Sequence, residues 1–153
     1  MESLARMMGQ VEVLPENFAQ RLQGFCEDVE RLHPISCHSE VNVHARLDNS
    51  EALTQLFHII RRAALNSITH GRADSITILV EGLAQQVRAT VEDDGVGLPP
   101  DFDPVKGTRL RVMIQRAAKI GAKLEILPAP TRGVLVVCTV PLSSLQKNPG
   151  LAA

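Results

Sequence analysis

The 153-residue sequence contains no tryptophan and no tyrosine, and its only aromatic residue is phenylalanine, at four positions. The core is therefore expected to be aliphatic. The missing rings also remove the usual stacking platforms for single-stranded nucleic acids. Because the formal net charge is −1, electrostatics give no reason for non-specific nucleic-acid binding. We expect no nucleic-acid partner.

Long apolar runs are also missing. No stretch approaches the roughly 20 residues that cross a bilayer, and no basic segment followed by an apolar one marks a secretory signal. The chain is therefore expected to be cytoplasmic, without direct membrane contact. Its three cysteines, Cys26, Cys37 and Cys138, lack the spacing of metal ligands. This favours buried free thiols in a reducing cytoplasm.

Apolar periodicity predicts three main helices. The first begins at Pro15 and ends before Pro34, with an apolar stripe of Phe18, Leu22, Phe25, Val29 and Leu32. The second follows capping side chains at 48–50, runs to about residue 69 and closes at Gly71. Its predicted buried face is Leu53, Leu56, Phe57, Ile60, Ala64 and Ile68. The third covers residues 109–120.

Alternating apolar residues predict five strands. We expect the first, residues 35–47, to be antiparallel with one wet face. The others are expected at residues 75–81, 86–92, 123–127 and 134–140. Helices and strands that alternate without regular βαβ units predict an α+β fold. This is a two-layer sandwich, with the three main helices on one face of a mixed sheet. Residues 143–153 are expected to form a flexible tail.

One segment, VEDDGVGLPPDF, has the residues of a candidate binding site at the end of a predicted strand. Asp93 ends that strand, and Gly95 and Gly97 follow it. A buried carboxylate there accepts a hydrogen bond from the amino group of a planar base, and glycines let backbone approach the base. The alternative is an ordinary turn, because Asp-Gly is a common turn dipeptide.

Two further segments point to phosphate chemistry. Asn66 lies on an otherwise apolar helix, where its carboxamide oxygen suits a hard cation such as Mg²⁺. The alternative is an Asn that faces solvent. Downstream, Gly107 precedes a helix start, whose N–H groups favour anions. The alternative there is an ordinary loop-to-helix junction.

Together and in order, LFHIIRRAALNSITHGRA, DDGVGLP and GTRLRVMIQRAAKIGAKLEI resemble the ATP-binding domain of bacterial sensor histidine kinases of the nitrate-sensor type. The resemblance covers roughly residues 53–142. That family shares the Bergerat ATP-binding fold with DNA gyrase, the heat-shock chaperone of about ninety kilodaltons and mismatch-repair ATPases. The resemblance therefore implies ATP and Mg²⁺ as cofactors.

Carried over to this sequence, the resemblance assigns individual roles. Asn66 is expected to hold Mg²⁺ between the ATP phosphates, and Asp93 to accept the adenine amino hydrogen. Gly95 and Gly97 would form the floor of the base pocket. His70 matches a position near the phosphates, or it simply interacts with the helix dipole. The remaining two positions belong to the lid over the phosphates, which Gly107 would begin and Leu110 would anchor.

The sequence departs from the family at three site positions. Arg62 stands where the family has a general-base Glu, and a guanidinium cannot act as a base near neutral pH. Arg62 would weaken the metal site, pair with phosphate directly, or face solvent. Arg109 replaces a lid glycine, which costs about 1 kcal/mol or more if that position needs positive φ. Val134 replaces a Thr whose hydroxyl helps to bind adenine.

The resemblance also implies partners. Residues 1–14 correspond to the end of a dimerisation-helix region, residues 15–142 to the ATPase domain and residues 143–153 to the tail. None of the five histidines fits the phosphoacceptor, so the chain is expected to phosphorylate a histidine on a separate dimerisation domain or chain, which then serves a response regulator. The isolated domain is expected to be a monomer, and the chain to be an excised domain or a natural single-domain protein. Two alternatives are a degenerate nucleotide-binding or scaffolding module and an anti-sigma-factor serine kinase.

Overall fold

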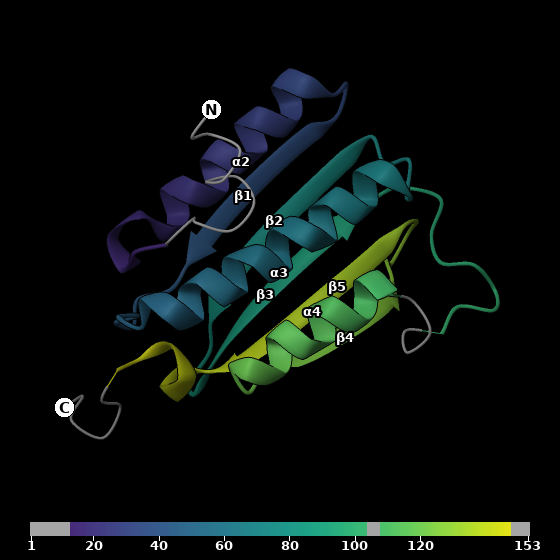
Figure 1. Cartoon of the computed structure of the whole chain (residues 1–153). Helices are drawn as coiled ribbons and strands as arrows, with labels where there is room; N and C mark the ends of the chain where they lie inside the picture. The colour runs from purple at the N-terminus through teal and green to yellow at the C-terminus, as the bar shows by residue number, and fades with distance from the viewer. Residues whose placement is uncertain (1–12, 104–107, 148–153) are drawn as a thin grey trace.

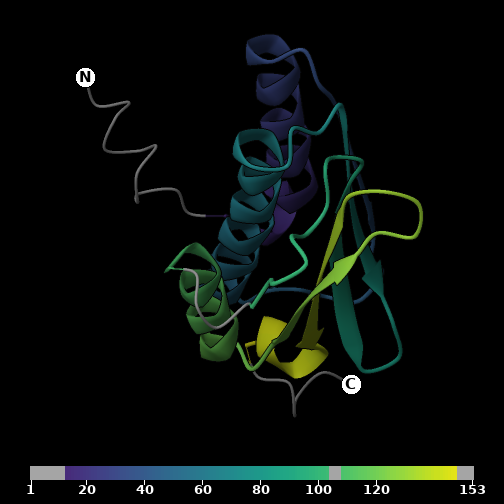
Figure 2. The same cartoon turned by 90° about the vertical axis from the view of Figure 1, so that its right-hand side faces the viewer.

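The computed structural model describes residues 13–103 and 108–147, with only the backbone of residues 108 and 109. Within these residues, a five-stranded sheet carries three long helices on one face (Figure 1). Figure 2, turned by 90°, shows the helices on one side and the strands on the other. The predicted α+β two-layer sandwich is therefore confirmed. No helix in the described residues is long and apolar enough to cross a bilayer.

The helices begin and end close to the predicted positions. A 3-10 turn, η1 (Pro15–Asn17), leads into α2 (Phe18–Leu32), and the others are α3 (Ser50–Thr69) and α4 (Thr108–Lys119). The side chain of Asn49 caps α3 by accepting a hydrogen bond from the backbone N–H of Ala52 at 3.2 Å. At the other end, the N–H groups of His70 and Gly71 both donate to the carbonyl of Asn66.

The buried face of α2 is rotated from the predicted stripe. Phe18, Leu22 and Val29 are buried as predicted, but Leu32 is 66% exposed, so its assignment to the core is wrong. Cys26 lies on the buried face instead. Because the buried face turns toward Cys26, Leu32 falls at its margin, in the last residue of the helix.

The strands are β1 (Ser36–Asn42), β2 (Ser75–Gly82), β3 (Gln86–Asp93), β4 (Lys123–Pro128) and β5 (Val134–Pro141). Their order in the sheet is β1-β2-β3-β5-β4. The expectation that the first strand is antiparallel is wrong, because β1 pairs with β2 in parallel. The intervening α3 carries the chain back to the same end of the sheet, as a crossover between parallel strands must. The strand also ends at Asn42, five residues before the predicted end.

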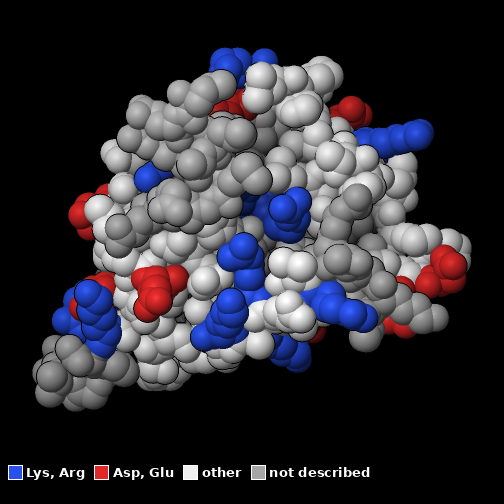
Figure 3. Space-filling view, in the orientation of Figure 1, with Lys and Arg blue, Asp and Glu red and all other residues white. Residues whose placement is uncertain are grey.

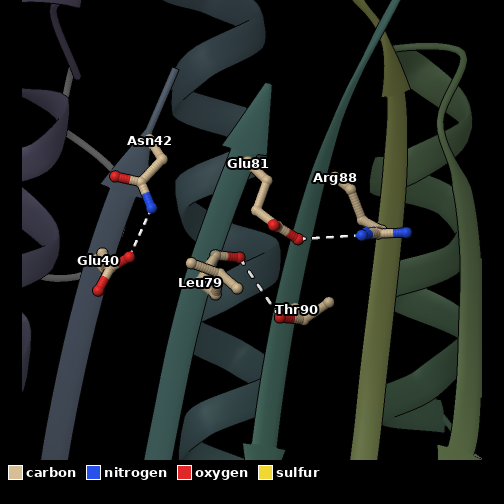
Figure 4. Close-up of polar contacts among 6 residues, drawn as sticks. All are labelled: Glu40, Asn42, Leu79, Glu81, Arg88 and Thr90. Carbon is tan, nitrogen blue, oxygen red and sulfur yellow. Dashed lines mark hydrogen bonds and ion pairs between the residues drawn. The ribbon is translucent and has the colours of Figure 1, made fainter. Parts of the chain in front are cut away.

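The second face of the sheet carries no helix within the described residues, and polar side chains lie on it among apolar ones. Figure 4 shows this face with the helices behind it, and Glu81 of β2 beside Arg88 of β3. Their side chains form an ion pair at 3.0 Å. Nearby, the hydroxyl of Thr90 donates to the backbone carbonyl of Leu79 at 3.5 Å. The sheet therefore has the single wet face expected of a two-layer sandwich.

The two ends of the described chain both pack onto the start of α3. The predicted linker, residues 1–14, lies outside the described residues except for Val13 and Leu14. Val13 is buried, and its N–H donates to the hydroxyl of Thr54 at 2.9 Å. The start of the expected flexible tail, from residue 143, is instead structured. A 3-10 turn, η2 (Leu142–Leu145), forms there and buries Leu145 completely.

Candidate functional site

A cavity of about 800 Å³ opens between α3, the end of β3, the loop that follows it, and α4. The residues predicted for the site that line this cavity are Asn66, His70, Asp93, Gly97 and Leu110. The structure therefore brings together segments that are far apart in the sequence. Gly95 is not among the lining residues, although its N–H donates to the carboxylate of Asp93. Gly107 lies outside the described residues.

Asp93 is the polar centre of the cavity. The residue is 4% exposed, and its carboxylate accepts three hydrogen bonds from different parts of the chain. Oδ2 accepts from the hydroxyl of Ser67 in α3 at 2.6 Å. Oδ1 accepts from the backbone N–H groups of Gly95 at 2.9 Å and Val134 at 3.1 Å. Because two carboxylate oxygens offer about four acceptor positions, one position remains for a ligand donor.

Gly95 allows the loop after β3 to pass directly over the end of α3. A Cβ atom on Gly95 would lie 2.0 Å from the carbonyl oxygen of Gly71, which no side chain tolerates. The same approach lets the N–H of Val96 donate to that carbonyl at 2.8 Å. The prediction for this glycine is a close approach of the backbone to the base, and that stays a prediction. The close approach that the structure shows is to Gly71, just after α3.

A second carboxylate, Asp94, faces the other way and secures the loop. Its Oδ1 accepts hydrogen bonds from the N–H groups of Asp74 and Ser75, both at 2.9 Å. These two bonds lower the pKa of Asp94 below its ordinary value. Asp93 and Asp94 are adjacent in sequence, but only Asp93 turns into the cavity.

Asn66 lies on the α3 side of the cavity and is half-buried. Its carboxamide forms no hydrogen bond with the rest of the described chain, so it is available to a ligand. Within the described residues, no group of three His, Cys, Asp or Glu side chains is arranged to hold a metal ion. A Mg²⁺ ion at Asn66 would therefore take its other ligands from phosphate and water, which is the usual habit of this ion.

The remaining walls of the cavity are largely apolar. They come from the loop after β3, from α4 and from strands β4 and β5, and include Phe102, Met113, Ile126 and Val136. An apolar cavity with one buried acceptor is suited to a flat ring that carries an amino group. The position of Leu110 in the first turn of α4 adds it to this wall.

Arg62 lies outside the cavity lining, although Asn66 one turn later belongs to it. Its side chain is exposed, as in the solvent-facing alternative. It is part of a basic cluster, Arg61, Arg62 and Arg116, on α3 and α4, and Figure 3 shows Lys and Arg side chains gathered over the middle of this helical face. Burial and the charges of Arg62 and Arg116 lower the pKa of Arg61. Burial, with Arg116 and Arg61, also lowers the pKa of His58.

The other two departures from the family are seen more clearly in the structure. Arg109 lies in the first turn of α4 and has helical backbone, so the cost of a positive φ does not arise there. Val134 lines the cavity with its side chain and supports Asp93 with its backbone N–H. The hydrogen bond to Asp93 is therefore independent of which side chain position 134 carries.

Three residues that contact Asp93 or Gly95 were not predicted from the sequence. Ser67 falls four residues after Ala63, on the apolar side of α3, and this placement of a hydroxyl in a buried face was a usable signal. Gly133 passes over Asp93, since a Cβ atom there would lie 2.1 Å from the Asp93 carbonyl oxygen. Arg132 donates from Nε to the carbonyl of Gly95 at 2.9 Å. No sequence pattern marks these last two contacts, because they join the loop before β5 to residues 93–95, which are distant in the chain.

Known proteins are similar to the part of the chain that contains this cavity. Residues 51–144 match the family described as "Histidine kinase-, DNA gyrase B-, and HSP90-like ATPase". The Sensor protein NarQ homolog of Haemophilus influenzae is 31% identical over 107 residues, which are 67% of this chain and 19% of that protein. The Nitrate/nitrite sensor protein NarX of Escherichia coli K12 is 25% identical over 118 residues, which are 77% of this chain and 20% of that protein. The chain thus spans about a fifth of the length of these two relatives.

Among solved structures, the crystal structure of the ATP binding domain of PrrB from Mycobacterium tuberculosis is similar to this chain with a TM-score of 0.70. The similarity covers 86% of this chain and 96% of that domain, at 19% sequence identity. At this identity the comparison establishes a shared fold.

Proposed function

Because the matched residues 51–144 make up more than half of the sequence, the chain belongs to the histidine kinase-, DNA gyrase B- and HSP90-like ATPases, and we propose that it binds Mg-ATP as the catalytic domain of a two-component sensor histidine kinase. The observation that carries the proposal is the buried carboxylate of Asp93, which lines one largely apolar cavity together with the carboxamide residue Asn66. The names of the similar sensor proteins NarQ and NarX support the same function.

The base end of the site is built around Asp93. The exocyclic amino group of adenine donates to the carboxylate position that Ser67, Gly95 and Val134 leave free. A guanine would turn a carbonyl oxygen toward the same carboxylate, which is unfavourable because both groups only accept. Gly97 borders the ring edge, and the apolar walls exclude water from the ring faces.

The phosphate end lies toward the C-terminal half of α3. There the carboxamide oxygen of Asn66 would hold Mg²⁺, and His70 at the helix end would lie beside the phosphates. Mg²⁺ bound there would neutralise the charge that develops on the phosphoryl oxygens. Leu110 fixes the start of α4 against the cavity, and Gly107 would begin the covering segment.

The acceptor of the phosphoryl group is a histidine on a separate dimerisation domain or chain. That histidine then passes the phosphoryl group to a response regulator. The neutral imidazole of such a histidine already carries a lone pair on one nitrogen. No general base is therefore required to remove a proton before attack, and Arg62 in place of Glu does not by itself abolish transfer. Phosphoryl transfer depends mainly on positioning and charge neutralisation, which the cavity would supply.

Calorimetric titration with a non-hydrolysable ATP analogue tests the binding step. We expect binding in the micromolar range that tightens when Mg²⁺ is added. No binding at millimolar nucleotide would contradict the proposal. The transfer step is tested with γ-labelled ATP and a histidine-bearing dimerisation domain from a nitrate-sensor-type kinase. An acid-labile label on that domain supports catalysis, whereas binding without label would favour the degenerate nucleotide-binding module.

A further inference from the structure

Two of the cysteines that the sequence leaves as isolated thiols lie against each other. The thiol of Cys37 in β1 donates to Sγ of Cys26 in α2, with 3.1 Å between the sulfur atoms. A disulfide bond is about 2.05 Å long, so the two sulfur atoms are about 1 Å from bonding distance. The third thiol, Cys138, lies on β5 and is separated from this pair by β2 and β3.

The β1 end of the segment that joins the two thiols is held in place by two hydrogen bonds. The carboxylate of Glu30 in α2 accepts a hydrogen bond from the backbone N–H of Cys37 at 3.1 Å. The neighbouring Ser36 N–H donates to the carbonyl of Asp74 at 2.9 Å. Both cysteines are also buried, at 4% and 7% exposure. The thiols therefore face each other as a consequence of the fold, which limits the rearrangement needed to join them.

We propose that Cys26 and Cys37 form an intramolecular disulfide bond when the protein meets a peroxide. In the first step, the Cys26 thiolate attacks the O–O bond of hydrogen peroxide, gives a sulfenic acid and releases hydroxide, which takes up the thiol proton as water. In the second step, the sulfur of Cys37 attacks the sulfenic sulfur, the S–S bond forms, and a second water leaves. Two thiols and one hydrogen peroxide thus give one disulfide and two waters, and the two electrons lost by sulfur reduce the peroxide.

The hydrogen bond between the thiols assigns their order. As the acceptor, Cys26 has its pKa lowered mainly by the bond from Cys37, and a bond from Ser39 acts in the same direction against the effect of burial. For Cys37, the bond that it donates and its burial both raise the pKa. Since the thiolate is the attacking form, Cys26 reacts with peroxide first and Cys37 resolves the sulfenic acid.

The disulfide would tie an edge helix to an edge strand. Among the described residues, those that line the cavity belong neither to α2 nor to β1. We therefore expect oxidation to leave nucleotide affinity unchanged within about twofold, since the cavity is untouched. The cross-link removes freedom from the unfolded chain and is expected to raise the melting temperature by about 5 °C. The inference does not depend on the proposed function.

Treatment of the full chain with hydrogen peroxide, followed by thiol counting under denaturing conditions and mass spectrometry, tests the proposal. The free thiols should fall from three to one, and the mass should drop by two hydrogen atoms. The variant Cys138→Ala should lose the same mass, whereas Cys26→Ala and Cys37→Ala should not. Loss of thiols through added oxygen or through cross-links between chains, with no loss of hydrogen, would overturn the proposal.

Melting curves of the reduced and oxidised protein provide the second readout. The rise in melting temperature should appear in the parent chain and in Cys138→Ala, and it should disappear when the disulfide is reduced again. A melting temperature that peroxide leaves unchanged, the same in the parent chain as in Cys26→Ala and Cys37→Ala, would show that no such disulfide forms, and this result would also overturn the proposal.

Discussion

At the scale of single residues, the proposed base site depends on the groups that surround Asp93. Three donors reach its carboxylate from α3, from the following loop and from β5. These donors fix the orientation of the carboxyl plane before any ligand arrives. A ligand that supplies a fourth donor therefore meets a preorganised acceptor in a dry site, where a charge-assisted bond is stronger than in water.

Replacement of this carboxylate gives the sharpest residue-level prediction. Asp93→Asn is expected to weaken binding of the ATP analogue about 10- to 100-fold, because a hydrogen bond to a charged group is lost. The introduced amide N–H₂ would also face one of the donors that now serve the carboxylate. Calorimetric titration of the folded variant measures the loss.

Glu92→Gln is the matched control for this variant. Glu92 precedes Asp93 by one residue, is exposed and points to the opposite face of β3. The same carboxylate-to-amide change there should leave affinity within about twofold, since exposed charges at a distance are screened. Equal affinities for Asp93→Asn and the parent chain would show that the base does not bind at Asp93.

Arg62 is the second residue that the account singles out. It lies one helical turn before Asn66, where side chains are about 5–6 Å apart at Cβ. Arg62→Glu removes a positive charge near the proposed Mg²⁺ position and adds a negative one. We expect Mg²⁺-dependent binding to tighten about fivefold, as fits an exposed charge in high dielectric, with Arg62→Gln giving a smaller gain. Affinity that is the same in all three proteins would mean that Arg62 lies out of reach of the metal.

At the scale of elements, the packing of the loop on α3 can be tested by comparing two glycines, one in a crowded and one in an open position. Gly95→Ala inserts a methyl group 2.0 Å from the Gly71 carbonyl oxygen, and we expect it to lower the free energy of unfolding by about 1–3 kcal/mol or more. Gly24→Ala is the control, because nothing lies within 4 Å of the added Cβ in the middle of α2. This change should raise stability by about 0.5–1 kcal/mol. Denaturant titration distinguishes the two, and a neutral Gly95→Ala would contradict the close approach.

The positions of the helices could be predicted from the sequence because their ends carry local chemistry. Asn49 caps α3, and Gly71 and Pro34 mark where helices close. The direction of β1 could not be predicted in the same way. Alternation along a strand shows which side chains face the core, but it carries no information about the neighbouring strand. The connection through α3 decides the parallel pairing with β2.

The residues of the candidate site also divide into those that the sequence could predict and those that it could not. Asp93, Gly95 and Asn66 lie in local sequence patterns, so they could be proposed from the sequence. Ser67, Gly133 and Arg132 act on Asp93 or Gly95 across the fold, and contacts between distant segments leave no local pattern. The Cys26–Cys37 contact escaped prediction for the same reason, since it depends on how α2 turns its face toward β1.

At the scale of the whole molecule, charge is unevenly distributed although the formal net charge is only −1. Lys and Arg side chains gather over the helical face, as Figure 3 shows, and the cavity opens between two of those helices, α3 and α4. The opposite layer shows the second face of the sheet, with the Glu81–Arg88 pair (Figure 4). An anionic nucleotide would therefore approach from the helical side, where the potential favours negative charge.

Amide NMR shifts, recorded while the labelled chain is titrated with an ATP analogue and Mg²⁺, show where on the fold the nucleotide binds. We expect the largest shifts at the N–H groups of Gly95 and Val134, which donate to Asp93, and at Gly71 at the end of α3. The strand β1 should stay unshifted. Large shifts confined to β1 or to the second face of the sheet, with Gly95 and Val134 unmoved, would contradict a nucleotide site between α3 and the end of β3.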